Sequence, residues 1–294
     1  MKILVTGKNG QVGFELSRSL AVLGDVRAVD IADCDLSDSA AIRNLVQGYH
    51  PDVIVNPAAY TAVDKAESDR LMAEAINTTA PAVFAEEAQR IGALLVHFST
   101  DYVFDGQKVG AYTEEDVPNP QSVYGASKLA GERAVQAGCE RHLILRTSWV
   151  VGAHGANFAK TMLRLATERE ALSVVADQFG APTSAALLAD VTAHLIRQAS
   201  LSAQDMPYGL YHAVAGGVTS WHGYACHVIE RARAAGKSIR LAPDAIKAIT
   251  TAEYPTPAKR PANSRMETSK LCQTFGLHLP HWQAGVDHIL DQIL

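Results

Sequence analysis

The sequence predicts an α/β fold in which a doubly wound parallel sheet is followed by a smaller C-terminal region. Strand-like and helix-like segments alternate through the first half of the chain. The strand-like segments are nearly continuous apolar runs, as expected when helices cover both faces of a parallel sheet. Beyond about residue 150 the alternation becomes less regular. The length of 294 residues suits one large domain or two unequal ones.

The expected elements follow one another along the chain. In the first half, strands are expected at 3–6, 26–30, 52–56, 93–99 and 142–146, and helices at 11–23, 39–49, 67–91 and 124–137. Further on, helices are expected at 158–169, 185–198 and 282–294, and a strand at 208–213. We expect residues 1–150, with part of 181–215, to form the sheet domain, and residues 151–294 to form mainly the second domain.

The composition is that of a globular protein rather than a membrane or nucleic-acid-binding chain. Hydrophobic residues make up 48% of the sequence and charged residues 19%, and the net charge is −5. This charge argues against nucleic acid or an anionic membrane as a partner. The sequence shows neither a signal peptide nor a membrane span, and four scattered cysteines without a CxxC pattern indicate reduced thiols. We therefore expect a cytoplasmic protein.

A glycine-rich turn follows the first expected strand. Gly7, Gly10 and Gly13 are spaced three apart between residues 3–6 and the first expected helix. In this setting the turn amides and the helix N-terminus face a pyrophosphate. The turn is therefore a candidate dinucleotide site of the Rossmann type.

Two acidic positions after the second expected strand fit the same ligand. Asp30 ends that strand, where a carboxylate accepts hydrogen bonds from an adenosine ribose. Asp35 and Leu36 follow in a polar loop and suit the adenine amino group and ring face. Each position taken alone is also typical of a turn or a helix cap. Together with the glycine turn they favour a dinucleotide site.

A YxxxK pattern supplies the candidate catalytic pair. Tyr124 and Lys128 lie four apart on an expected helix and share one face. A lysine ammonium about 5 Å from a phenol favours the phenolate, so we expect Lys128 to lower the pKa of Tyr124. Thr100 follows the strand at 93–99, where its hydroxyl can bind a developing oxyanion. The alternative is a chance pair on a solvated helix.

These motifs resemble the extended short-chain dehydrogenase/reductase superfamily, and within it the dTDP-4-dehydrorhamnose reductases. The resemblance is carried by GKNGQVG (7–13), NPAAYTAVDKAE (56–67), FSTDYVFDG (98–106), VYGASKLAGE (123–132), LRTSWV (145–150), NFAKTMLRLA (157–166), DQFGAPT (177–183), YPTPAKRPANSR (254–265) and LPHWQAGV (279–286). It covers essentially the whole chain.

The resemblance implies binding roles at the matching positions. For the cofactor these are Gly10, Gln11 and Val12 at the pyrophosphate, Asp30 at the ribose, Asp35 and Leu36 at the adenine, and Ala59, Tyr60 and Thr61 at the nicotinamide half. Pro57 departs from the family pattern, because it removes an amide donor near the cofactor.

The resemblance also implies a catalytic group and a substrate side. Thr100, Tyr124 and Lys128 form the implied catalytic group, with Lys128 also on the nicotinamide ribose, and Asp101 and Trp149 contact the sugar nucleotide. Arg260 and Arg265 flank the segment PANS and are candidates for pairing with the substrate diphosphate. Trp149 as a core side chain and both arginines as solvated groups are the alternatives.

The implied activity is NAD(P)H-dependent reduction of the C4 ketone of dTDP-4-dehydro-β-L-rhamnose, the last step of dTDP-rhamnose biosynthesis for lipopolysaccharide and O-antigen. Two alternatives stay open: a sugar-nucleotide epimerase or dehydratase on the same fold, and a non-catalytic, cofactor-binding regulatory subunit. A dehydratase needs an acid directly after Asp101, and Tyr102 stands there instead.

Cofactor choice and metal use are the remaining expectations. Asp30 suits NADH, whereas the resemblance implies NADPH, so we expect both to be accepted, with Arg27 or Arg43 offsetting the charge of a 2′-phosphate. The resemblance also allows magnesium and a homodimer. Asp287 and Asp291 are candidate ligands, with a solvated helix face as the alternative.

Overall fold

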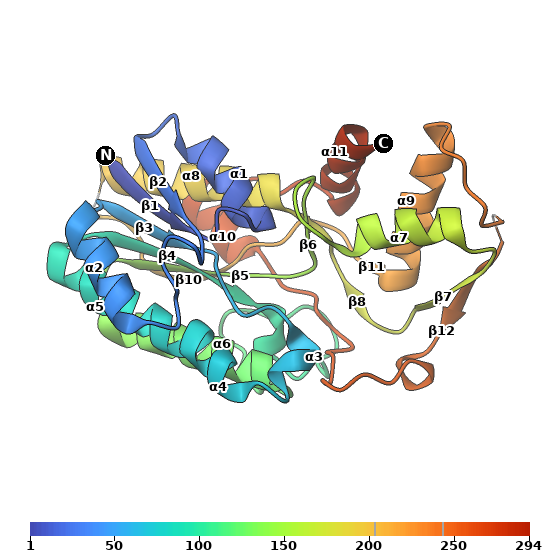
Figure 1. The fold of residues 1–294 in the computed structure, drawn as a ribbon, viewed down its shortest axis with the longest axis horizontal. Helices are drawn as coiled ribbons and strands as arrows, with labels where there is room; N and C mark the ends of the chain where they lie inside the picture. Colours follow the sequence, from blue (N-terminus) through green and yellow to red (C-terminus); the bar gives the residue numbers. More distant parts are fainter. Residues whose placement is uncertain (203, 243) are drawn as a thin grey trace.

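A six-stranded parallel sheet forms the first part of the computed structural model, which describes residues 1–202, 204–242 and 244–294 (Figure 1). Its strands lie in the order β10 (Gly209–His212), β5 (His142–Thr147), β4 (Leu94–Thr100), β3 (Val53–Asn56), β1 (Lys2–Thr6) and β2 (Asp25–Val29). All neighbouring strands pair in parallel. The expected doubly wound α/β sheet is confirmed.

Helices cover both faces of this sheet. One face carries α1 (Gln11–Leu20), α8 (Ala185–Leu201) and α10 (Ser269–Phe275), and the other carries α2 (Ser39–Tyr49), α5 (Ala80–Ile91) and α6 (Val123–Gly138). Side chains alternate between the two faces along each strand. Ile3 and Val5 therefore pack in the apolar cluster under α1, α8 and α10, and Leu4 packs in the cluster under α2, α5 and α6. This two-sided burial explains why the strands are continuous apolar runs.

The helix expected at 67–91 is broken. It consists of α4 (Arg70–Glu74), a π-helical turn (Ala75–Thr79) and α5, and a short helix, α3 (Val63–Ala66), precedes it. Pro81 lies in the first turn of α5. Because proline has no N–H and its ring clashes with the carbonyl four residues earlier, a regular helix cannot continue through Asn77.

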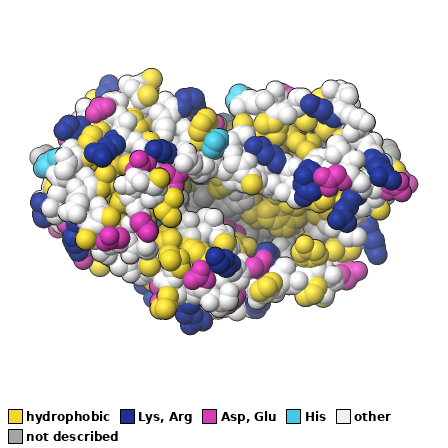
Figure 2. Space-filling model, in the orientation of Figure 1, with side chains coloured by type: hydrophobic (Ala, Val, Ile, Leu, Met, Phe, Trp, Pro, Cys, Tyr) yellow, Lys and Arg dark blue, Asp and Glu magenta, His cyan; other side chains and the backbone are white. Residues whose placement is uncertain are grey.

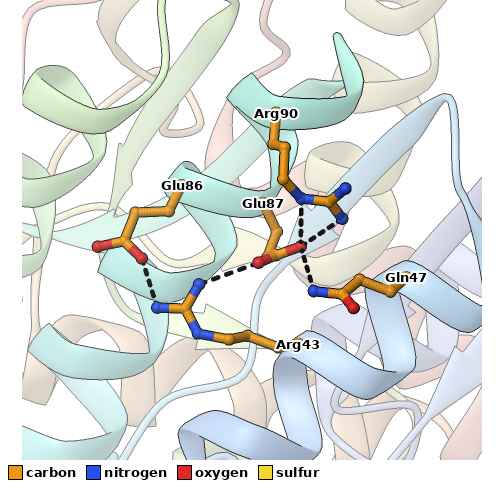
Figure 3. A network of polar contacts seen from close by, with 5 residues as sticks. All are labelled: Arg43, Gln47, Glu86, Glu87 and Arg90. Atoms are coloured by element: carbon orange, nitrogen blue, oxygen red, sulfur yellow. Dashed lines mark hydrogen bonds and ion pairs between the residues drawn. The ribbon is translucent and has the colours of Figure 1, made fainter.

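Charged side chains join α2 to α5 on the surface. Glu87 is buried and accepts hydrogen bonds from Arg43 at 2.9 Å, Gln47 at 3.2 Å and Arg90 at 2.6 Å (Figure 3). Arg43 also pairs with Glu86. Arg43 is therefore engaged in holding two helices together.

The C-terminal region has its own apolar core. Its helices are α7 (Phe158–Glu168), α9 (Trp221–Ala234) and α11 (Trp282–Ile293). Its short strands form three pairs: β7 (Leu172–Val175) with β12 (Ile246–Ile249), β8 (Phe179–Gly180) with β11 (Thr219–Ser220), and β6 (Val150–Val151) with β9 (Thr183–Ser184). Of these, the sequence predicted α7 and α11. Figure 2 shows the face of the molecule hollowed between this region and the sheet.

Candidate active site

A cleft of about 460 Å³ lies at the C-terminal edge of the sheet. It is lined by the glycine-rich turn, the loop after β3 and the start of α6, and it includes Tyr124 and Lys128. A recess of about 250 Å³ adjoins it, shares Asp30 and Ala59 with it, and contains Asp35 and Leu36. The structure therefore brings the predicted cofactor residues other than Tyr60, together with the YxxxK pair, into two adjoining hollows.

The geometry of the turn requires glycine at two positions. Gly7 has φ +64°, and a Cβ on Gly13 would lie 2.0 Å from the Gly7 carbonyl oxygen. Gly10 is the N-cap of α1, and no side chain of the described residues forms a capping hydrogen bond at this N-terminus. The first amides of α1, from Gln11 onward, are thus available to an anion. The turn fits a dinucleotide pyrophosphate.

Asp30 is fixed against this turn. Its carboxylate accepts the amide of Asn9 at 2.9 Å and that of Ile31 at 2.8 Å. Its own amide donates to Asp33, which pairs with Lys8 at 2.6 Å. Sequence reasoning proposed Arg27 and Arg43 as nearby cations and missed Lys8, which lies in the glycine-rich turn.

The other proposed charge partners have contacts of their own, and of the two Arg27 also acts through its charge on Asp33. Arg43 pairs with Glu86 and Glu87, so the suggestion that it offsets a 2′-phosphate is not supported by its position. Arg27 lies over the ring of Tyr49 at 5.4 Å. Asp35 accepts the amide and hydroxyl of Ser37 at 2.8 Å each, a turn contact that lowers its pKa.

The loop after β3 borders the other end of the cleft. Pro57, Ala59 and Thr61 line it. Tyr60 donates its backbone amide to the Asn77 side chain at 2.8 Å and its hydroxyl to Asp69 at 2.9 Å. The phenol of Tyr60 is thus held by Asp69, the residue before α4 (Arg70–Glu74), and Pro57 lines the cleft without an amide to donate.

Burial decides the protonation state of Tyr124. Enclosure by the protein raises its pKa to about 12, while contact with the Thr100 hydroxyl opposes this. The amine of Lys128 instead donates to the Phe98 carbonyl at 2.6 Å, and burial lowers its pKa to about 8. The expectation that Lys128 lowers the pKa of Tyr124 is wrong for this structure. At neutral pH the phenol keeps its proton.

Thr100 and Asp101 form a pair at the end of β4. The Thr100 hydroxyl donates to the Asp101 carboxylate at 3.0 Å and accepts the amide of Tyr102 at 3.2 Å. Burial raises the pKa of Asp101 to about 6. Its Oδ2 has no hydrogen-bond partner among the described residues.

Three more hydroxyls at this edge are buried without a partner in the described part of the chain. They belong to Ser99, Thr147 and Ser148. Buried polar groups are normally paired, so these hydroxyls are candidates for contact with a bound molecule. Sequence reasoning missed them, although each lies at the end of a strand beside a residue that it did select.

Trp149 adopts a strained backbone conformation and stacks on another tryptophan. Its φ is +49°, and its ring lies 3.7 Å from that of Trp221, nearly parallel to it. A Cβ on Gly180 would lie 2.9 Å from the Trp149 ring. Sequence reasoning missed Trp221, whose N–H donates to Gln178 within the segment DQFGAPT.

The two arginines after residue 254 have partners within the chain. Arg260 pairs with Asp64 at 2.8 Å, and its charge acts on the nearby Tyr102. Arg265 donates to Asn263 at 2.7 Å. Neither lines the cofactor cleft.

The predicted metal ligands do not form a metal site. Asp287 pairs with His227 and Arg231, and Asp291 pairs with Arg231. The described residues contain no group of three or more His, Cys, Asp or Glu side chains able to hold an ion.

Over the same residues, every helix is too short or too polar to cross a membrane.

Comparisons with known proteins agree over the whole chain. The family model described as the RmlD substrate binding domain matches residues 1–294. A dTDP-4-dehydrorhamnose reductase of Shigella flexneri is 52% identical, over 100% of this chain and 98% of the relative.

Solved structures give the same result. A dTDP-4-dehydrorhamnose reductase of Clostridium acetobutylicum has a TM-score of 0.88 at 37% identity, covering 100% of this chain and 99% of the other. One of Bacillus anthracis, in complex with NADP, has a TM-score of 0.89 at 35% identity, covering 99% of each chain. The chain therefore belongs to the family of the RmlD substrate binding domain.

Proposed function

We propose that this chain reduces the C4 ketone of dTDP-4-dehydro-β-L-rhamnose to the alcohol of dTDP-β-L-rhamnose, using NADPH or NADH. The observation that carries the proposal is the single cleft that joins the glycine-rich turn to Tyr124 and Lys128. Full-length relatives that bear the name of this reductase support the choice of substrate.

The residues around the cleft suit a nicotinamide dinucleotide. The turn at Gly7, Gly10 and Gly13 holds the pyrophosphate, and Asp30 holds the adenosine ribose. When bound, the reduced nicotinamide supplies a hydride to the ketone carbon. The solved Bacillus anthracis relative is a complex with NADP, which supports the same cofactor class here.

Tyr124 is the proposed proton donor to the ketone oxygen. A phenol whose pKa is raised to about 12 is fully protonated at neutral pH and has a proton to give. Thr100 donates a hydrogen bond to the developing oxyanion when its hydroxyl proton turns away from Asp101, and Lys128 binds the nicotinamide ribose. Asp101 and Trp149 position the sugar.

Two regions divide this work. We assign residues 1–150, together with α8 and β10, to cofactor binding, and most of 151–294 to the nucleotide sugar. The contacts of α8 and β10 with the sheet domain support this division. Trp149 and Trp221, stacked on each other against the apolar core of the C-terminal region, are the proposed wall for the sugar or the base.

The test is oxidation of NADPH and of NADH by the purified protein, with and without enzymatically generated dTDP-4-dehydrorhamnose. We expect oxidation only when the sugar nucleotide is present. An epimerase would instead retain its nicotinamide through gel filtration and show no net oxidation. Tight cofactor binding without any turnover of the sugar would indicate a regulatory subunit.

A further inference from the structure

The side chain of Lys128 makes a buried polar contact with His97 on β4. The side-chain nitrogen of Lys128 lies 3.4 Å from Nε2 of His97 and donates to the Phe98 carbonyl at 2.6 Å. His97 is fully buried, and Lys128 is 2% exposed. The lysine is therefore held from strand β4 by one ring nitrogen and one carbonyl.

The contact continues across the sheet. Nδ1 of His97 lies 3.2 Å from the side-chain nitrogen of Asn56, and Oδ1 of Asn56 accepts the Thr6 hydroxyl at 2.6 Å. The backbone amide of Ala58 donates to the Thr6 hydroxyl oxygen at 3.3 Å. Ala58 belongs to the loop that lines the cofactor cleft. We call Lys128, His97, Asn56 and Thr6 the buried polar chain.

The sheet register creates this chain. Asn56 is paired directly with His97 across β3 and β4, and the pairing of Val5 with Val55 brings Thr6 beside Asn56. Thr6 and Asn56 are each 1% exposed. A buried polar group left unpaired destabilises the folded protein, so each member needs its neighbours.

We propose that His97 is a positioning residue for the reductase, fixing the Lys128 amine and linking it through Asn56 and Thr6 to the cofactor loop at Ala58. The proposal rests on the assigned roles of Lys128 and of this loop. It explains why a histidine stands at a fully buried strand position.

The imidazole suits this task because it is neutral. Burial and the neighbouring Lys128 hold the pKa of His97 well below its usual value. A neutral ring has one acceptor nitrogen, which can accept from the Lys128 amine through Nε2. Its other nitrogen then carries the proton and faces the Asn56 side-chain amide, which can accept that proton when its oxygen is turned towards the ring and its nitrogen towards Thr6. His97 thereby contacts the lysine without adding a like charge beside it.

A double-mutant cycle between His97→Leu and Lys128→Ala tests the proposal. We expect His97→Leu to lower kcat/KM by about tenfold and to weaken NADPH binding measured by fluorescence. In the Lys128→Ala background the same substitution should change both quantities less than about twofold. A histidine that served only packing would give equal losses in both backgrounds, and that result would overturn the proposal.

Two further variants separate positioning from packing. His97→Gln keeps a donor and an acceptor near Lys128, so it should recover most of the activity that His97→Leu loses. Val96→Ala is the control: Val96 is equally buried on the same strand but belongs to the apolar cluster on one face of the sheet. We expect Val96→Ala to lower stability and to leave kcat/KM of the folded protein near wild type. If folded His97→Gln is as impaired as His97→Leu, the proposal is wrong.

Thr6→Val provides the same test if His97→Leu does not fold. It removes the hydroxyl between Asn56 and Ala58 at nearly constant volume. Non-additivity with Lys128→Ala supports the chain, and additivity contradicts it. A wild-type protein that binds NADPH but does not reduce the sugar nucleotide would refute the proposed function instead, because NADPH affinity is measured without turnover.

Discussion

At the C-terminal end of β4, the side chains of Asp101 and Tyr124 are both enclosed by protein, and this enclosure raises both pKa values. The sequence predicted which residues meet here, because strand ends and helix spacing fix their positions. It predicted the wrong direction for the pKa of Tyr124, because spacing along a helix gives neither the depth of burial nor the direction of the Lys128 amine. A bond to a backbone carbonyl such as Phe98 leaves no signal in a sequence.

Replacing Asp101 with asparagine should change how stability depends on pH. The folded-state pKa, about 6, lies above the usual value of 3.8, so ionising Asp101 costs stability as the pH rises from about 4 to about 7. The difference between these two pKa values corresponds to a loss of about 3 kcal/mol in the free energy of unfolding. Urea denaturation of both proteins should show that wild type loses stability relative to Asp101→Asn over this range. Parallel pH profiles would show that Asp101 is not held in its neutral form.

Cofactor preference should depend on two residues of opposite charge. Asp30→Ala removes repulsion of a 2′-phosphate and should shift the ratio of kcat/KM towards NADPH by about tenfold. Lys8→Ala should shift the ratio towards NADH, because it removes a positive charge that can attract the 2′-phosphate. Lys8 pairs with Asp33, which accepts the amide of Asp30. Arg43→Ala is the matched control, since its charge is engaged by Glu86 and Glu87. An equal ratio in all four proteins would mean that neither Asp30 nor Lys8 contacts the ribose region.

Among the elements, the sheet strands and most long helices follow the sequence pattern, whereas α9 and the short or interrupted elements were not predicted. Helix α9 was not predicted, although Tyr224, Val228 and Ile229 have helical spacing and Ser220 caps the helix. Strands of two residues, such as β8, have no periodicity to detect. Their pairing depends on partners distant in the chain.

Gly180 in β8 has no side chain, and this leaves the space that the Trp149 ring occupies. A methyl group there meets the ring at 2.9 Å, so Gly180→Ala should displace Trp149 and raise KM for the sugar nucleotide severalfold, with NADPH affinity unchanged. Steady-state kinetics with each substrate varied measures this. Gly48→Ala, where an added Cβ meets nothing within 4 Å, is the control. A larger effect on NADPH than on the sugar would place Trp149 on the cofactor side.

Across the whole molecule, the sheet domain is completed by residues that come late in the chain. Strand β10 forms the edge beside β5, and α8 and α10 supply Leu188, Leu195, Leu271 and Phe275 to one apolar cluster. The sequence predicted that part of 181–215 returns to the sheet. It did not predict α10, because a seven-residue helix after a proline-rich stretch gives a weak pattern.

A fragment of residues 1–150 should therefore not fold alone. One face of its sheet would expose the apolar side chains that α8 and α10 cover in the full chain. Thermal denaturation followed by circular dichroism should show a cooperative transition for residues 1–294 and none for residues 1–150. A cooperative transition in the fragment would show that the returning segments are dispensable.

The Tyr124→Phe variant tests most directly the claim that Tyr124 is the proton donor of a ketone reductase. Only the hydroxyl is lost, so kcat should fall by about 10²-fold or more while the Kd for NADPH stays within about twofold of wild type. The measurement is kcat for dTDP-4-dehydrorhamnose reduction alongside NADPH binding by fluorescence titration. A variant that reduces the sugar nucleotide at a near-normal rate would contradict the account.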